Sequence, residues 1–293
     1  MNKKRRKNKF KNKFLNRFDD GITLTKSELK KIIIILVVLT SVLFIVFSFY
    51  KSYLFNNKYV GLGESKEIPI CEYDLSKLKN DKNGYMSYED SKYKSRIIID
   101  VSSHNGDINW KEVKKAGING AMIRVGYRGY GDATIVEDEC FQKNIAGAKD
   151  AGLKVGVYFF SQATTPEEAI EEAEYVTEKI WGRGVSLPVA FDMEPFMGNE
   201  RFINHDIKSK TEMADAFLKV ISKFGYEPIL YGNPTWLTGD VDISKLTEYP
   251  IWLAHYTYST EWPYMFRMWQ FTSQGRVEGI NGDVDLNLIF DKK

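Results

Sequence analysis

The chain has little cysteine and little histidine, with two Cys and three His among 293 residues. Two cysteines are too few for the disulfide framework of a small secreted scaffold, although a single bridge between Cys71 and Cys140 stays open. The histidines show no ligand spacing such as H-E-x-x-H, so the sequence predicts no metal and no cofactor. The glycines over 126–131 lack the Lys-Ser/Thr of a phosphate loop. The three histidines are His104, His205 and His255.

Charge is absent from residues 32–50, the nineteen-residue run IIIILVVLTSVLFIVFSFY. At 1.5 Å per residue, an apolar helix of this length spans roughly 30 Å, the thickness of the hydrocarbon core of a bilayer. A cleaved signal peptide would have a shorter apolar region and a small-residue cleavage site, which the following KSYLFNNKYV does not supply. The sequence therefore predicts one transmembrane helix over residues 32–50.

Positive charge is concentrated before this run, because residues 1–31 contain twelve Lys or Arg against three acidic residues. Basic segments beside a membrane span stay in the cytoplasm, so we expect a basic cytoplasmic tail and an extracellular remainder after Tyr50. Clustered Lys and Arg can bind nucleic acid, but beside a span they are better explained by topology and contact with anionic lipid. We therefore predict a single-pass protein of the cell membrane with no nucleic-acid partner. Its richness in Lys, Asn and Ile is typical of an AT-rich Gram-positive source.

The rest of the chain divides at about residue 95. Residues 51–95 are polar, contain KLKNDKNG and show no sustained periodicity, which predicts an extracellular stalk or linker. Residues 96–293 form the predicted folded domain. Its apolar runs predict eight strands, at residues 97–101, 120–125, 154–160, 187–193, 228–231, 250–254, 267–271 and 284–289.

Helix patterns separate the earlier strands. Thr165-Pro166-Glu167-Glu168 supplies a cap, a first-turn proline and a capping-box glutamate ahead of an apolar stripe. Shorter patterns lie at 109–117, 141–152 and 213–225, whereas no long helix is visible after Tyr231. Alternating strands and helices imply parallel strands, and about eight strands imply closure. We predict an α/β fold, an irregular TIM-like (β/α) barrel, with a doubly wound open sheet as the alternative.

Acidic residues stand at the ends of three predicted strands. In LPVAFDMEP, Asp192 and Glu194 point to the same face, at the carboxyl end of a strand where barrels hold their active sites. The first strand ends in Asp100, and the last places Asp285 between two apolar residues, where a charge needs a task or a partner. Any one of them can be a solvated strand end. All four together favour a catalytic cluster, and paired carboxylates suit cleavage of glycosidic bonds.

Aromatic residues also gather at or just past strand ends. Tyr158, Tyr231 and Trp269 are best placed to stack on a sugar, although most large aromatics in a barrel belong to the core.

Several segments, in order along residues 97–289, resemble glycoside hydrolase family 25, the lysozymes. They are IDVSSHNGDINW, VGVYFFSQATTPEEA, FDMEP, YGN, IWLAHY and MWQFTSQGRVEGINGDVDLN. The resemblance implies metal-free hydrolysis of the β-1,4 bond from N-acetylmuramic acid to N-acetylglucosamine in peptidoglycan. It also implies that Glu194 is the general acid, Asp192 its companion carboxylate, Asp100 the first-strand acid and Asp285 the acid of the V-D-L-N motif.

Two other functions are compatible with this pattern. A non-catalytic tether to peptidoglycan would predict loss of some of the acids, yet all four are present. A chitin-type hydrolase would carry a longer D-x-x-D-x-D-x-E run, and VAFDMEP lacks its upstream aspartates. Spacing does not distinguish direct attack by Asp192 from participation of the substrate's own N-acetyl group. Nor does the sequence identify any envelope-spanning apparatus as a partner.

Overall fold

The computed structural model describes residues 26–59, 62–194 and 205–293, and the chain forms two compact units, Met1–Phe55 and Asn56–Lys293. Of the predicted cytoplasmic tail, residues 1–25 lie outside the described part of the chain. Each unit is described by itself below.

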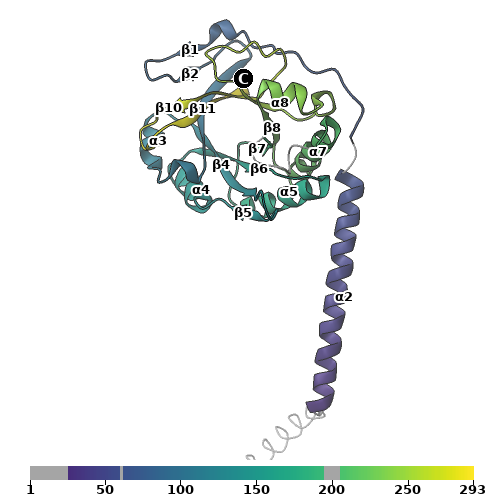
Figure 1. The fold of residues 1–293 in the computed structure, drawn as a ribbon. Coiled ribbons are helices and arrows are strands. Elements are labelled where there is room, and N and C mark those ends of the chain that lie inside the picture. Colours follow the sequence, from purple (N-terminus) through teal and green to yellow (C-terminus); the bar gives the residue numbers. More distant parts are fainter. Residues whose placement is uncertain (1–25, 60–61, 195–204) are drawn as a thin grey trace, which may run out of the picture. The chain divides into compact units, whose positions relative to one another are not determined.

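The first unit contains most of one long helix, α2, which spans Lys26–Tyr59 (Figure 1). The apolar side chains at positions 32–46 are all exposed. Among the described residues, no helix is long and apolar enough to cross a membrane. The predicted span over 32–50 runs past residue 46, the last in this helix whose side chain is described. The transmembrane helix therefore stays a prediction.

The second unit is built on a closed barrel of eight strands surrounded by helices (Figure 1). The strand order is β3-β11-β10-β9-β8-β7-β6-β4, a β3–β4 pairing closes the ring, and β5 extends β4 on the outside. The closed barrel is confirmed, and the open sheet is excluded. The strands are β3 Tyr93–Val101, β4 Gly120–Arg128, β5 Ile135–Glu137, β6 Lys154–Phe160, β7 Val189–Asp192, β8 Pro228–Gly232, β9 Ile251–Ala254, β10 Met268–Gly275 and β11 Val284–Lys292.

One prediction about the barrel is wrong: the last strand does not run parallel to the others. Seven strands are parallel, but β11 is antiparallel to both β10 and β3. Residues 276–283 join β10 to β11 without a helix, and so short a connection suits antiparallel neighbours. The start of β11 therefore lies at the carboxyl end of the other strands, where Asp285 is opposite Asp100 in register.

The helices follow the predicted signals. Thr165 caps α5 by accepting a hydrogen bond from the Glu168 N–H, and Pro166 occupies the first turn. An unpredicted short helix, α8, begins in the same way, because Asn233 accepts from the Trp236 N–H. Six residues are too few to show a helical period. Among the described residues, the helices that lie wholly in this unit are α3 Trp110–Lys115, α4 Phe141–Asp150, α5 Pro166–Ile180, α7 Ile207–Lys223 and α8 Pro234–Gly239, with 3-10 turns at Leu75–Lys77, Ser103–Asn105 and Ile243–Lys245.

The predicted stalk over residues 51–95 needs correction, because most of its second half packs on the barrel. The Lys66 N–H donates to Ser244 O, and backbone hydrogen bonds join residues 69–71 to residues 263–265. The Tyr73 ring stacks on Phe290 with 4.3 Å between ring centroids. A small hairpin follows, with β1 Lys79–Asn80 antiparallel to β2 Met86–Ser87.

The apolar residues of this segment explain why it docks. Tyr73, Met86 and Tyr88 are each less than a tenth exposed, and burial of each large side chain contributes about 1.5–3 kcal/mol. Their irregular spacing hides this burial from a search for helical or strand periods. We call residues 66–92 the docked segment. Both cysteines, Cys71 and Cys140, are free thiols.

Candidate active site

The four predicted acids come together at one end of the barrel. They line a cavity of about 310 Å³ at the carboxyl ends of the parallel strands. Apolar side chains fill the barrel interior, among them Ile98, Met122 and Met268. The cavity is lined by Asp100, Val101, Ser102, His104, Asn105, Arg124, Tyr158, Phe160, Asp192, Glu194, Tyr231, Trp252, Tyr256, Gln270 and Asp285.

Asp192 and Glu194 form the first carboxyl pair. Both line the cavity, while Phe191 and Met193 are buried, as strand alternation predicts. The two acids hydrogen-bond each other, and burial raises the pKa of both. The charge of Glu194 raises the pKa of Asp192 further, and Asp192 Oδ1 is buried without a hydrogen-bond partner among the described residues. The two carboxyls therefore share a proton and titrate as a coupled pair, each with a raised pKa.

Asp100 and Asp285 form the second pair. Asp100 Oδ2 accepts from Asn287 Nδ2 at 2.7 Å and from Gln270 Nε2 at 3.0 Å. Burial, and then the charge of Asp100, raise the pKa of Asp285 to about 9. Asp285 consequently holds a proton at neutral pH and donates it in a hydrogen bond to Asp100, which carries the negative charge.

The amide residues that hold Asp100 were missed from the sequence. Gln270 also accepts from the hydroxyls of Tyr231, at 3.0 Å, and Tyr256, at 3.1 Å, which fixes its amide so that the NH₂ points to Asp100. Strand alternation could have found it, because Gln270 shares a face with the core residue Met268.

Strand alternation could also have found Asn287, because it lies two residues after Asp285 on β11 and so shares a face with it. Its Oδ1 accepts from Trp252 Nε1 at 2.8 Å, so its NH₂ is directed at Asp100. Trp252 itself lines the cavity.

Of the three aromatic residues predicted to contact a sugar, two line the cavity and one does not. Tyr158 and Tyr231 line the cavity. Trp269 does not: it is fully buried, donates from Nε1 to His255 O, and packs edge-on against Phe266 and Phe271. Its neighbours on β10 face the barrel interior, so Trp269 faces outward. The prediction for Trp269 is corrected accordingly.

A second cavity, of about 510 Å³, adjoins the first and shares Glu194, Tyr231 and Tyr256 with it. Its other walls include Asn233 and His255. Glu194 therefore lies where two hollows meet.

Arg124 is a cationic side chain that lines the cavity, and its charge slightly offsets the rise in the Asp192 pKa. Arg124 Nε is held by Asp138 Oδ2 at 2.8 Å, and a terminal nitrogen donates to Ser103 Oγ at 3.1 Å. Within the described ranges, no group of three or more His, Cys, Asp or Glu is arranged to hold a metal ion.

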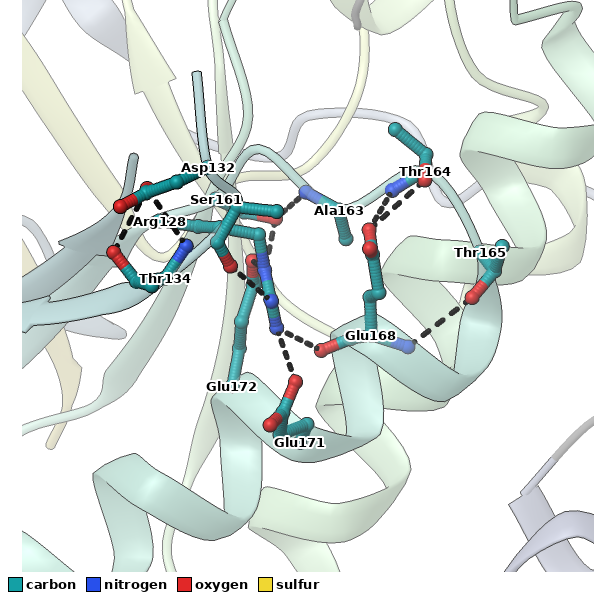
Figure 2. A network of polar contacts seen from close by, with 11 residues as sticks. Arg128, Asp132, Thr134, Ser161, Ala163, Thr164, Thr165, Glu168, Glu171 and Glu172 are labelled. Carbon is teal, nitrogen blue, oxygen red and sulfur yellow. Dashed lines mark hydrogen bonds and ion pairs between the residues drawn. The ribbon is translucent and has the colours of Figure 1, made fainter. Parts of the chain in front are cut away.

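A polar network surrounds Arg128 and Glu172 (Figure 2), and its member Ser161 connects it to the backbone of Asp192. Arg128 at the end of β4 pairs with Glu172 of α5 at 2.8 Å, and both are almost fully buried. Ser161 Oγ donates to the other Glu172 oxygen at 2.6 Å, and the Ser161 N–H donates to Asp192 O at 2.7 Å. The network thus fixes the backbone that carries Asp192. Burial raises the pKa of Glu172 to about 7.

Comparison with known proteins gives a consistent result. A model of glycosyl hydrolases family 25 matches residues 99–280. Lysozyme M1 of Streptomyces globisporus is 28% identical over 201 residues, which are 64% of this chain and 66% of that protein. The autolytic lysozyme of Clostridium acetobutylicum is 26% identical over 190 residues, 64% of this chain and 54% of that protein.

The solved structures agree on the fold. The modular autolysin LytC of Streptococcus pneumoniae, in complex with a synthetic peptidoglycan ligand, superposes with a TM-score of 0.61 at 24% identity. The match covers 76% of this chain and 52% of LytC. The chain thus spans between about half and two thirds of the length of these three relatives.

Proposed function

Because the chain belongs to family 25 of the glycosyl hydrolases, we propose that it is a peptidoglycan muramidase. It hydrolyses the β-1,4 bond between N-acetylmuramic acid and N-acetylglucosamine. One observation supports this most directly: two hydrogen-bonded carboxyl pairs line a single cavity that continues on the far side of Glu194.

Glu194 is the general acid of this proposal. It donates its proton to the leaving glycosidic oxygen as the bond to the anomeric carbon breaks. Burial, and then the charge of Asp100, raise the Glu194 pKa, which favours the protonated form that a general acid needs. A bound sugar displaces water from the cavity and strengthens this effect.

Asp192 acts as the companion carboxylate. In the reactive state the shared proton lies on Glu194, and Asp192 is ionised to stabilise positive charge at the anomeric carbon or to orient the N-acetyl group. Arg124 favours this ionised form. The hydrogen bond from Ser161 to Asp192 O holds the strand end in place. Water completes the hydrolysis, and its proton returns to Glu194.

Asp100 and Asp285 support the first pair from the opposite wall. The proton on Asp285 limits the negative charge of the second pair to one, which three donors distribute over Asp100. A single buried charge is enough to raise the Glu194 pKa without forcing the cluster apart.

We further propose that residues 32–50 anchor the protein in the cell membrane, with the N-terminus in the cytoplasm and the catalytic unit outside. The uncharged apolar run in α2 and the basic residues before it support this topology. Protease added to intact cells should digest the region after Tyr50. Protection of that region would contradict the topology.

The muramidase proposal is tested by adding the full chain, in detergent micelles, to purified peptidoglycan. We expect loss of turbidity and release of soluble glycan fragments. Co-sedimentation with intact peptidoglycan, without any release, would instead identify a non-catalytic tether.

A further inference from the structure

A groove beside the catalytic cavity belongs to neither of the hollows described so far. It has a volume of about 480 Å³, and Tyr256 lines both it and the cavity. One wall is the tip of the β1–β2 hairpin, at Asn83 and Gly84, and the other comes from Thr257, Tyr258 and residues 271–276.

We propose that this groove binds the sugar units of the glycan strand that lie beyond the cleavage site, with the hairpin of the docked segment as its outer wall. The inference rests on the proposed function and extends it: it assigns part of the substrate binding to residues that precede the barrel.

The hairpin wall is preformed. Asp81 accepts hydrogen bonds from the N–H groups of Asn83, at 2.8 Å, and Tyr85, at 2.9 Å, while its own N–H donates to Tyr85 O. Gly84 has a φ of 80°, which lets the chain turn back without strain. Binding of a ligand in the groove therefore costs little conformational entropy at the hairpin tip.

The chain that follows the hairpin tip is also fastened to the barrel. Tyr85, which directly follows the tip, donates its hydroxyl to the backbone oxygen of the groove residue Arg276 at 3.3 Å. Met86 on β2 and Tyr88 just after this strand are only 3% and 2% exposed. The gap between hairpin and barrel thus has a fixed width.

The chemistry of the lining suits a neutral sugar. Tyr256 and Tyr258 are 57% and 79% exposed, so their rings are free to stack on a pyranose. Thr257, Ser273 and Gln274 add neutral hydrogen-bonding groups. A single exposed tyrosine is ordinary, but two together at the mouth of a catalytic cavity form a stacking surface.

The same lining argues against an acidic stem peptide as the occupant. Among the described residues, Arg276 is the one charged side chain in the groove, and it is paired with Asp283 at 2.8 Å. Recognition of carboxylates normally uses cations that are free to form bidentate contacts.

The experiment measures binding of peptide-free glycan tetrasaccharides and octasaccharides to the full chain in detergent micelles, by calorimetry. All samples carry Glu194→Gln so that the ligand is not cleaved. We expect the octasaccharide to bind about fivefold more tightly than the tetrasaccharide, a gain typical of one well-placed aromatic contact. Tyr258→Ala should remove this gain, and Asn83→Ala should reduce it.

Trp181→Ala is the matched control, because Trp181 is 72% exposed at the end of α5 and does not line the groove. It should leave the length dependence intact. Equal affinities for the two lengths, or a full gain in Tyr258→Ala, would overturn the inference. Tighter binding that appears only when stem peptides are present would overturn it in favour of a peptide site.

Failure of the proposed function gives a different result. Suppose that the unsubstituted chain cleaves no glycan, while affinity still rises with glycan length and Tyr258→Ala still removes that rise. The groove would then be supported as a glycan-binding site, and the muramidase proposal would be contradicted.

Discussion

The single buried carboxyl of Glu172 and the four acids of the cavity lie near the same end of the barrel, and their hydrogen-bonding needs are met in different ways. Glu172 is neutralised by a cation, Arg128, and its second oxygen accepts from Ser161 (Figure 2). The four acids of the cavity instead form two carboxyl pairs that share protons, and Asp100 also accepts from the amides of Gln270 and Asn287. A carboxylate that is paired with a cation is suited to stabilising the fold. A carboxyl that shares a proton beside a cavity is suited to transferring that proton to a substrate.

Of the substitutions that test this difference, one in the cavity should have the largest effect. Glu194→Gln removes the transferable proton but keeps the shape, so kcat on peptidoglycan should fall by about 10²–10⁴-fold. Thermal unfolding should stay close to that of the unsubstituted chain. Glu167→Gln, an exposed glutamate of α5, is the control. Activity of Glu194→Gln near that of the control would remove Glu194 from the acid role.

On the structural side, Arg128→Met leaves Glu172 buried without its cation. The free energy of unfolding, measured with denaturant, should fall by about 3–5 kcal/mol. The loss should be smaller at pH 5 than at pH 8, because Glu172 can then fold in its protonated form. Adding Glu172→Gln should recover part of the stability. An unchanged free energy of unfolding in Arg128→Met would contradict the role given to the ion pair.

Glu172 should also leave a signature in the pH dependence of stability. Its pKa is about 7 when folded, against an ordinary 4.5, so the folded state binds its proton more tightly. Its contribution is greatest below pH 4.5 and is lost as the pH rises through 7, on the order of 3 kcal/mol. Glu172→Gln should therefore flatten the fall in unfolding free energy between these pH values. An equally steep fall in the variant would show that other groups cause it.

The smallest expected effect concerns coupling between the two carboxyl pairs. Asp100→Asn removes the charge that raises the Glu194 pKa. The alkaline limb of the pH profile of kcat/KM should move to lower pH, in addition to any loss of rate. Asp107→Asn, at an exposed residue outside the cavity, should leave the limb in place. A limb that does not move in Asp100→Asn would mean that the two pairs titrate independently.

The parts of this site that the sequence predicts are local ones. Asp192 and Glu194 follow a buried strand with a period of two, and that period is enough to place both on one face. The same rule applied to β10 places Gln270 inward and Trp269 outward, but the prediction weighed Trp269 by its position near a strand end instead.

The parts that the sequence does not reveal depend on neighbours distant in the chain. The short connection before β11 makes this strand antiparallel to its neighbours. Only that direction brings Asp285 opposite Asp100, which lies far away in the sequence. The docked segment shows no sustained period, because Tyr73 and Tyr88, fifteen residues apart, both pack on Phe290 near the end of the chain. Local patterns cannot show such packing.

The central claim is the bond that is cut. The full chain in detergent micelles should be incubated with peptidoglycan, the products reduced with borohydride, and the new reducing ends identified by mass spectrometry. The account predicts reduced N-acetylmuramic acid at the new ends. New ends of reduced N-acetylglucosamine would contradict it, because they would require cleavage of the other glycosidic bond of the strand.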